Sequence, residues 1–408
     1  MLKGNAVVGQ SGGPTSAINA TLVGVIFSSG QSELIDKLYG MKYGIEGLLE
    51  EKLVDLSYLY DDEESLFVLE STPSSALGSC RKRLPNISED SRMYEKIFSI
   101  FKKYDIRYFF YIGGNDSMDT VAKLSEYSKM CDYEVKVIGV PKTIDNDLVI
   151  TDHTPGYGSA AKFIATTIKE ISCDTSVYLC DAVTIVEIMG RDAGWLTASA
   201  GLPKYFGYEG ADLIYLPEVY FNDDELITAI KDKLKEKPNV VVAVSEGIRY
   251  ENGKYVGEGV QSGSTDAFGH KYLAGTAKAL ETLVKEKIGC KVRSIELNLP
   301  QRCSAHITSD TDISESRKIG SYAVKCAEEG ISGKMMIYTR KKGNYEIELS
   351  YEDVEKIANK VKLVPQEFIN EKGNYVTNQC MEYIAPLICG ERNIKYENGL
   401  PVHFKIRG

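Results

Sequence analysis

The chain has 408 residues, of which 43% are hydrophobic and 26% are charged, an ordinary composition for a soluble globular enzyme. At roughly 150 residues per domain, it is long enough for two or three domains with sizeable cores. Its 48 Lys and Arg against 58 Asp and Glu give a net charge of −10. This balance argues against a nucleic-acid binder but allows an anionic substrate in a locally positive cleft.

The sequence also argues against a membrane, secreted or zinc-binding protein. No apolar run approaches the roughly 18 residues that span a bilayer, and the N-terminus lacks the apolar core of a signal peptide. Nine cysteines are scattered without a C-x-x-C pair, and the four histidines show no metal-ligand spacing. We therefore expect a cytoplasmic protein with reduced thiols and no membrane partner.

Short apolar strands alternate along the chain with longer amphipathic segments, which predicts an α/β fold. The expected strands are apolar on both faces, as strands inside a parallel sheet must be. In chain order they span residues 6–9, 107–112, 135–140, 183–189, 213–216, 240–244, 292–297 and 335–339. Helical spacing of apolar residues predicts helices over 158–171, 271–287 and 314–329.

Clusters of glycine and polar residues follow many of these strands. They are Q-S-G-G-P at 10–14, G-G-N-D-S at 113–117, P-K-T-I-D-N-D at 141–147, M-G-R at 189–191, S-E-G at 245–247 and Q-R at 301–302. In an open α/β sheet, ligands bind at the carboxyl ends of the strands. The coincidence therefore predicts a ligand site at that edge.

The two glycine-rich turns allow more than one interpretation. Gly12 and Gly13 let the backbone bring N–H groups to an anion at the start of a helix near Ala17, but a plain strand-to-helix turn fits equally well. The sequence matches neither a P-loop nor a dinucleotide fingerprint. Asp116 in the second turn suits a metal ligand, a residue that repels a ligand, or the cap of a helix that begins near Met118.

The segment 141–147 favours a catalytic interpretation. Asp145 and Asp147 point the same way if the segment is extended, and Lys142 precedes the first of them by three residues. This arrangement suits a general base with a metal-facing partner and a lysine that neutralises phosphate. The alternative is a solvated turn, for which D-N-D is also suitable.

Several further side chains are candidates for binding a phosphorylated sugar. Guanidinium groups bind phosphate through two parallel hydrogen bonds, which makes Arg191, Arg81 and Arg83 candidate phosphate ligands, although surface arginines are common. Glu246 suits a hydrogen bond to a sugar hydroxyl or an ion pair with a nearby cation.

Taken together, these motifs resemble those of the phosphofructokinase family, whose order and spacing they follow over about residues 5–310. The resemblance implies two Rossmann-like three-layer α/β domains with mostly parallel sheets and an active site in the cleft between them. It places a phosphoryl-donor domain at 1–156, completed by about 303–345, and a fructose 6-phosphate domain at 157–302. It leaves 346–408 without a placement.

The resemblance also implies roles for single residues. Asp145 matches the base that takes the proton from the C1 hydroxyl of fructose 6-phosphate, and the other catalytic residues implied are Lys142, Asp116, Thr143 and Arg191. The implied donor contacts are Gly12, Gly13, Gly114 and Arg81. The implied sugar-phosphate contacts are Thr143, Ile144, Asp145, Asp147, Met189, Gly190, Arg191, Glu246, Arg293 and Arg302, the last two arginines holding the 6-phosphate. Asn115 matches the magnesium-associated position, which makes Mg²⁺ the expected cofactor.

Two positions indicate which donor the enzyme uses. The ATP-using relatives carry glycine at the positions of Asp116 and Lys142, and here a carboxylate would fall near the α-phosphate of a nucleotide. Two like charges about 4 Å apart repel by roughly 4 kcal/mol at an effective dielectric near 20, which is on the order of a thousandfold in affinity. Lys142 supplies positive charge for a short inorganic donor. We therefore expect reversible transfer from pyrophosphate to fructose 6-phosphate, as in glycolysis.

Other positions depart from the common family pattern. Asn115 replaces an aspartate, so we expect Mg²⁺ to be held by donor oxygens and water. Ala182 stands where relatives place an arginine that reaches into the neighbouring subunit of a dimer or tetramer, and a homo-oligomer is expected here too. Val23 and Phe27 replace effector-site arginines, which predicts no allosteric control by that route.

Three other functions fit parts of the sequence. An ATP-dependent 6-phosphofructokinase shares most of the motifs but not Asp116 and Lys142. A non-catalytic sugar-phosphate sensor does not need a base at Asp145. A lipid or NAD kinase of related fold has no use for the sugar-phosphate clusters at 189–191 and 301–302.

Overall fold

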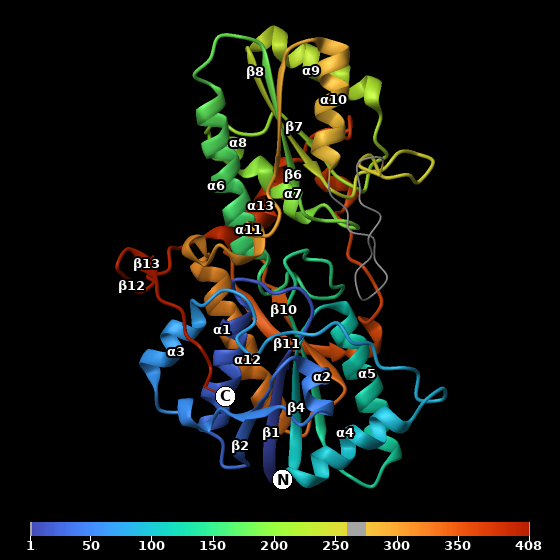
Figure 1. Ribbon diagram of the computed structural model, residues 1–408, viewed down its shortest axis with the longest axis vertical. Helices are drawn as coiled ribbons and strands as arrows, with labels where there is room; N and C mark the ends of the chain where they lie inside the picture. Colours follow the sequence, from blue (N-terminus) through green and yellow to red (C-terminus); the bar gives the residue numbers. More distant parts are fainter. Residues whose placement is uncertain (1, 259–274, 408) are drawn as a thin grey trace.

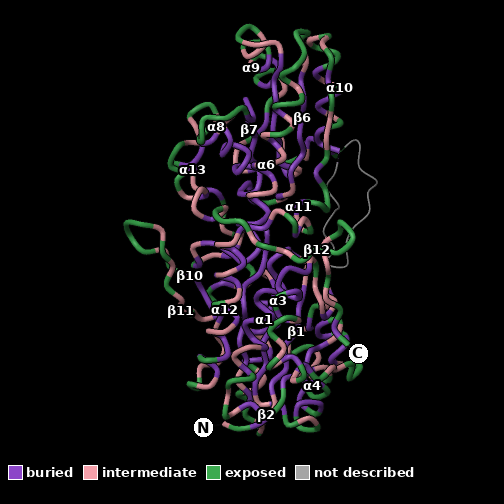
Figure 2. Tube along the Cα trace, turned by 90° about the vertical axis from the view of Figure 1, so that its left-hand side faces the viewer, coloured by how far each residue is buried: buried purple, intermediate pink, exposed green. Residues whose placement is uncertain are grey.

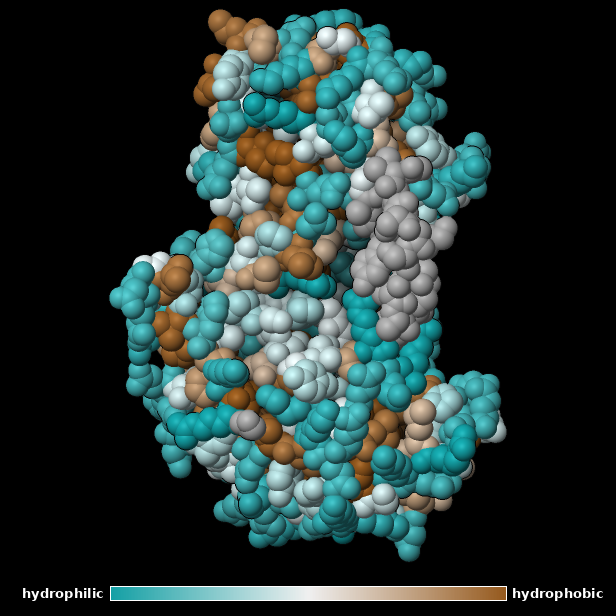
Figure 3. Space-filling model, in the orientation of Figure 1, coloured by the Kyte–Doolittle hydropathy of each residue, from teal (hydrophilic) through white to brown (hydrophobic). Residues whose placement is uncertain are grey.

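The computed structural model describes residues 2–258 and 275–407, and these form two lobes stacked along the long axis of the molecule (Figure 1). Each lobe is built around its own sheet, and the central strands of both sheets run through the buried interior (Figure 2). On the face in Figure 3, hydrophilic residues cover most of both lobes, with apolar residues scattered among them. Every helix in the described ranges is too short or too polar to cross a membrane.

The first lobe contains a seven-stranded sheet in the order β11-β10-β5-β4-β1-β2-β3. Its parallel strands are β1 (Gly4–Gln10), β2 (Ile35–Met41), β4 (Ile106–Gly113), β5 (Lys136–Pro141) and β10 (Lys334–Arg340). The antiparallel edge strands are β3 (Leu53–Asp55) and β11 (Ile347–Asp353). Residues from both ends of the described chain therefore build this sheet.

Helices cover both faces of the first sheet, since its central strands are apolar on both sides. One face packs against α1 (Ile18–Gly30), α3 (Glu63–Glu70) and α12 (Asp310–Glu328). The other packs against α2 (Gly44–Leu49), α4 (Arg92–Lys103) and α5 (Asn115–Met130). Helices α1 and α12 approach closely at two glycines, because a Cβ on Gly24 would lie 2.0 Å from the carbonyl oxygen of Arg317 and one on Gly320 2.1 Å from that of Thr21.

The second lobe contains a four-stranded parallel sheet in the order β7-β8-β6-β9. These strands are β6 (Ala182–Ile188), β7 (Leu213–Tyr215), β8 (Asn239–Ser245) and β9 (Lys291–Glu296). One face packs against α6 (Tyr157–Thr175), α7 (Trp195–Ala198), α8 (Leu202–Tyr205) and α13 (Asn378–Ile384). The other packs against α9 (Asp223–Glu236) and α10 (Thr276–Ile288). The predicted fold of mostly parallel sheets within three layers is confirmed.

The remaining elements are short. They are α11 (Pro300–Cys303), the 3₁₀ turns η1 (Ser57–Leu59), η2 (Ser199–Gly201), η3 (Ala305–Ile307), η4 (Val354–Lys356), η5 (Gln366–Phe368) and η6 (Ala385–Ile388), and the hairpin of β12 (Tyr396–Glu397) with β13 (Leu400–Pro401). Beyond β11 the chain packs on both lobes: Ile357 and Ile406 join cores of the first lobe, and Phe368 joins the second. The start of the helix predicted over 271–287 lies outside the described residues.

Candidate active site

The structure brings together the six clusters that follow the predicted strands. The first lobe supplies the carboxyl ends of β1, β4 and β5, and the second supplies those of β6 and β8. Contacts join the clusters: Met189 N donates to Gln301 Oε1 at 3.1 Å, and Gly190 N donates to Glu246 Oε1 at 3.2 Å. A Cβ on Gly13 would lie 3.1 Å from Arg302 Nη1. The site thus lies where the two lobes meet.

The donor-side loop after β1 is held by its neighbours. Gly12 has a left-handed backbone (φ +76°), which favours glycine at this position. Its N–H donates to Cys80 O at 3.2 Å, and its carbonyl accepts from Ser79 Oγ at 2.7 Å. The Gly12 N–H is therefore engaged within the protein, and the Gly13 carbonyl faces Lys142, whose Nζ donates to it at 2.5 Å.

Lys142 is a buried cation at the centre of the site, with 3% of its surface exposed. Burial lowers the pKa of its ammonium group to about 8, and the charges of Arg302 and Arg81 act in the same direction. The carboxylates of Asp145 and Asp147 oppose this shift. Lys142 therefore lies between the donor loop and the two carboxylates, with Arg302 and Arg81 adding positive charge around it.

The loop that carries the two aspartates is not extended, which corrects the expected geometry. Asn146 between them adopts a left-handed conformation (φ +52°), and its side chain is fully buried. Thr143 Oγ1 accepts a hydrogen bond from Asp145 N at 3.1 Å, and Ile144 packs into the apolar core of the second lobe. The turn nevertheless brings both carboxylates to the same site, since the charge of Asp147 raises the pKa of Asp145.

The pKa of Asp145 is raised to about 7, first by burial and then by the charge of Asp147. Lys142 and Arg191 partly offset this increase. Burial also raises the pKa of Asp147, which accepts a hydrogen bond from Thr143. A carboxyl group that titrates near neutral pH is suited to exchange a proton with a substrate hydroxyl.

The second lobe contributes the ends of β6 and β8 to the cleft. Gly190 has a positive φ of 135°, and Arg191 Nε donates to Asp192 Oδ2 at 3.2 Å. Burial raises the pKa of Glu246 to about 8, and the charge of Asp145 adds to this increase. A protonated Glu246 can donate a hydrogen bond as well as accept one, which is what a sugar hydroxyl requires.

The two residues at the start of α5 have partners that the sequence did not indicate. Asp116 Oδ1 accepts from Arg83 Nη2 at 2.7 Å and from Arg83 Nε at 3.1 Å, so Asp116 forms an ion pair and does not cap the helix. The helix begins after Gly114. Asn115 Nδ2 donates to Lys360 O at 2.6 Å, and Asn115 Oδ1 accepts from Asn359 N at 2.5 Å.

The contacts of Asn115 bear on the expected metal. Both ends of its amide are engaged by the backbone of the C-terminal segment. Within residues 2–258 and 275–407, no three His, Cys, Asp or Glu side chains gather in a way that could hold a metal ion. The described side chains therefore suit a cation whose oxygen ligands come mostly from bound molecules and not from the protein.

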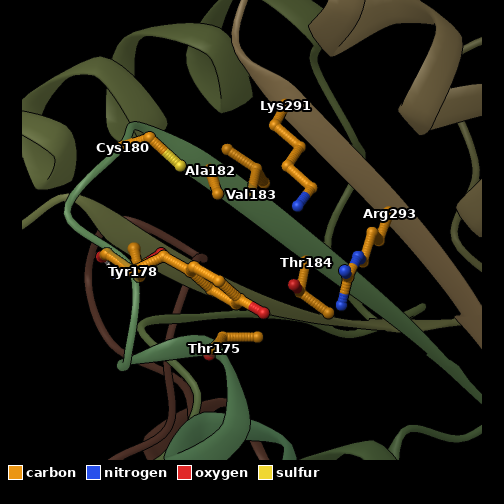
Figure 4. Close-up of a pocket in the computed structure, with 9 residues that line it drawn as sticks. Thr175, Tyr178, Cys180, Ala182, Val183, Thr184, Lys291 and Arg293 are labelled. Carbon is orange, nitrogen blue, oxygen red and sulfur yellow. Dashed lines mark hydrogen bonds between the residues drawn. The ribbon is translucent and has the colours of Figure 1, made fainter.

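The structure does not bring Arg293 to the other site residues. Arg293 extends from β9 over β6 and lines a small pocket with Thr184, Tyr178 and Ala182 (Figure 4). Its side chain is half exposed, and its nearest acidic partner is Asp174, with Nη1 3.8 Å from Oδ2. Arg302, in contrast, lies against the donor loop.

The sequence also gave no indication of Lys362, which lies beside the aspartate loop. Its Nζ donates to Asn146 Oδ1 at 3.2 Å and to Asp152 O at 2.8 Å. It belongs to an irregular segment without helical or strand periodicity, so a search for motifs after strands could not find it.

Comparisons with known proteins agree with the motifs. The family model described as Phosphofructokinase matches residues 5–327. The relative from Halomonas elongata, named pyrophosphate--fructose 6-phosphate 1-phosphotransferase, is 39% identical over 98% of this chain and 96% of its own length. A protein of the same name from Methylococcus capsulatus is 38% identical over 97% of this chain and 94% of its own.

A crystal structure extends the similarity to the fold. The pyrophosphate-dependent phosphofructokinase from Nitrosospira multiformis superposes with a TM-score of 0.89 at 36% identity, covering 99% of this chain and 96% of that one. With the family model, full-length relatives and a shared fold in agreement, this chain is a member of the phosphofructokinase family.

Proposed function

We propose that the protein transfers a phosphoryl group from pyrophosphate to the C1 oxygen of fructose 6-phosphate, giving fructose 1,6-bisphosphate and phosphate. The observation that carries this proposal is the buried Lys142 ammonium, which lies between the Gly13 carbonyl and the Asp145–Asp147 pair. ATP-using relatives have glycine at that position. The names of the full-length relatives support the same donor.

The chain's own residues account for the steps of the transfer. Asp145 takes the proton of the C1 hydroxyl, the C1 oxygen attacks phosphorus, and the bridging P–O bond breaks to release phosphate. Such catalysis consists mostly of positioning and charge neutralisation. Lys142 and Arg191 neutralise the charge that develops on the transferred group, and Arg302 and Arg81 supply further positive charge. The reaction runs in both directions because the free energies of hydrolysis of pyrophosphate and of a sugar phosphate ester are not far apart.

A bound Mg²⁺ would neutralise the charge of the donor's oxygens. It would be held mainly by those oxygens and by water, with Asp145 and Asp147 as the nearest carboxylates. Asn115 is a poor direct ligand because both ends of its amide already bond to backbone. Binding of the ion would therefore depend mainly on the oxygens of the donor.

The two lobes divide the substrates between them. In this proposal the first lobe binds the donor and comprises residues 1–156 together with a C-terminal segment at 303–345. The strand pair at 334–353 extends this segment by a few residues, because both of its strands belong to the sheet of the first lobe. The second lobe binds the sugar phosphate over 157–302. We place the enzyme in the cytoplasm, within glycolysis.

The test of the proposed function is a comparison of donors with fructose 6-phosphate and Mg²⁺. We expect pyrophosphate turnover to exceed ATP turnover by orders of magnitude, and phosphate to drive the reverse reaction. Faster turnover of ATP would make the protein an ATP-dependent 6-phosphofructokinase. Binding of fructose 6-phosphate without turnover of either donor would make it a sensor.

The activity should depend on pH through the aspartate pair. Since the carboxyl of Asp145 must be ionised to act as a base and its pKa is about 7, we expect kcat/KM to fall as the pH drops below 7. Replacing Asp147 with asparagine removes a like charge and lowers the pKa of Asp145, so the fall should move to lower pH. An unchanged acidic limb in D147N would contradict this coupling. The charged groups that face Asp145 are Asp147, Lys142, Arg191, Asp192 and Glu246.

Arg293 is proposed to hold the 6-phosphate of a sugar bound to a second copy of the chain, since it lies away from the site of its own chain. Replacing it with alanine should raise the KM for fructose 6-phosphate by roughly 10- to 150-fold, the value of a charged hydrogen bond of about 1.5–3 kcal/mol. The KM for pyrophosphate should not change. The matched control is K231A, because Lys231 is exposed on α9 and does not line the pocket that contains Arg293.

Mixed oligomers test whether Arg293 acts on the site of its own chain or on the site of a second copy. A D145N chain and an R293A chain together can form one site with both native residues only if Arg293 acts across subunits. Recovery of activity on mixing is the expected result. A chain that is monomeric and still loses fructose 6-phosphate affinity in R293A would contradict the proposal.

A further inference from the structure

The segment 359–364, which we call the strap, crosses from the first lobe to the second beside the candidate active site. It has neither helix nor strand structure after its first turn. At its start, Asn359 and Lys360 bond through their backbone to Asn115, at the head of the donor-side helix α5. At its other end, Val364 N donates to Glu218 Oε1 at 2.9 Å.

Glu218 in turn connects the strap to the sugar side. The same Oε1 atom accepts from Gly194 N at 2.9 Å, just before helix α7. In the middle of the strap, Trp195 Nε1 donates to Lys362 O at 2.8 Å, and Lys362 N donates to Asp147 O at 2.7 Å. The strap is therefore bonded to the donor helix, the aspartate loop and the sugar lobe.

The Lys362 side chain reaches beneath the aspartate loop. Its Nζ has three oxygen acceptors: Asn146 Oδ1 at 3.2 Å, Thr151 O at 3.2 Å and Asp152 O at 2.8 Å. In its protonated form Lys362 has three N–H donors, one for each acceptor. Burial lowers the pKa of this group to about 7, and the charges of Asp152 and Asp147 oppose the shift. The Trp195 ring lies 5.2 Å from the same nitrogen and shields it from solvent.

The hydrogen bond from Lys362 Nζ to Asn146 Oδ1 matters because Asn146 has a left-handed backbone. Asparagine tolerates the left-handed region better than most residues with a Cβ, but this conformation still costs energy relative to a right-handed or extended one, so contacts that hold the side chain favour it. The Asn146 side chain is held at both ends by the C-terminal part of the chain: Oδ1 by Lys362, and Nδ2 by Tyr383 Oη, to which it donates at 2.9 Å. This turn sets the positions of Asp145 before it and Asp147 after it.

We propose that Lys362 is a positioning residue for phosphoryl transfer, which holds Asn146 in its left-handed turn and thereby aims Asp145 at the acceptor hydroxyl. The proposal rests on the proposed function for the role of Asp145. Lys362 does not itself touch the substrates. It acts through Asn146 from a part of the chain that carries none of the family motifs.

The test compares K362M with the unaltered enzyme. Methionine keeps the apolar stem and removes the three donors, so we expect kcat to fall about 10- to 100-fold while both KM values change less than threefold. K362R, which retains the charge and the donors, should recover part of the lost kcat. K356M is the matched control, since exposed Lys356 pairs only with surface acids such as Glu352, at 3.0 Å, and should leave kcat unchanged.

A double variant separates positioning from a purely structural contribution. If Lys362 acts through Asn146, then K362M should have little further effect on kcat in an N146G background, where glycine adopts the turn without side-chain support. Equal effects of K362M in both backgrounds would overturn the proposal, as would unchanged kcat in K362M. If K362M fails to fold, Y383F, which removes the partner of Nδ2, must lower kcat without raising either KM.

The outcome is separable from that of the proposed function. The unaltered enzyme is first assayed with pyrophosphate and with ATP, and the variants are then compared with whichever donor it uses. Preference for ATP would overturn the proposed donor but leave the kcat comparison intact. The positioning role fails if kcat is unchanged in K362M or if Lys362 and Asn146 act independently.

Discussion

Replacing Asp145 with asparagine is expected to lower kcat by about 100- to 10,000-fold in both directions, the usual contribution of a general base. The substitution keeps the shape of the side chain and removes its ability to take a proton. The affinity for fructose 6-phosphate should stay within a few-fold of the original, because the sugar contacts proposed at Gly190, Arg191 and Glu246 are unaltered. Steady-state kinetics and calorimetric binding to the same preparation measure the two effects.

The D145N substitution should also remove the pH dependence that the carboxyl group of Asp145 causes. Residual activity should no longer fall between pH 7 and pH 6 with the titration of that group, whose pKa is about 7. A D145N variant that keeps most of its turnover would show that another group takes the proton. Glu246, whose pKa of about 8 is also raised by burial, would then be the residue to replace next.

The second large effect is expected at the two positions that distinguish donors. Replacing Lys142 with glycine removes a buried positive charge from the centre of the site, which we expect to lower kcat/KM for pyrophosphate by about 100- to 1,000-fold. The control is K136G, a glycine substitution at the first residue of β5, where Lys136 pairs with Glu134 at 2.8 Å. Coupled assays with each donor measure both variants.

The structure revises the expected contribution of Asp116. An unpaired carboxylate near the α-phosphate would repel ATP by on the order of a thousandfold, but Asp116 is paired with Arg83 and both side chains are partly exposed. D116G alone should therefore raise ATP turnover by no more than about tenfold, because solvent and Arg83 already screen the charge. The double variant D116G/K142G should gain most. A thousandfold gain in D116G alone would contradict this screening.

Much of the fold could be predicted because burial of the strands dictates the pattern of apolar residues along the chain. Each strand predicted from an apolar run is present, and the clusters after these strands converge on one site. Strand β2 was missed because Asp36 and Lys37 are exposed and interrupt its apolar run. Strand β11 was missed because an edge strand with one partner is only partly buried and carries charged side chains.

The candidate site could be predicted only where its chemistry is local in sequence. The side-chain partners of Asn146 at its left-handed turn are Lys362 and Tyr383, which lie more than 200 residues away. The partner of Asp116 depends on where the loop carrying Arg83 packs. The place of Arg293 depends on the direction of a side chain on β9, which a strand pattern does not distinguish from its neighbours. Such long-range contacts leave no periodic signal.

The close approach of α1 and α12 has a consequence for how the protein is made. The N-terminal strands leave the ribosome early, but the helix that packs against α1 at Gly24 and the strands that finish their sheet come from residues 310–353. The sheet of the second lobe, made from residues 182–296, is complete before them. The sheet whose strands are synthesised first is therefore completed after the sheet of the second lobe, and part of its apolar surface stays uncovered in the meantime.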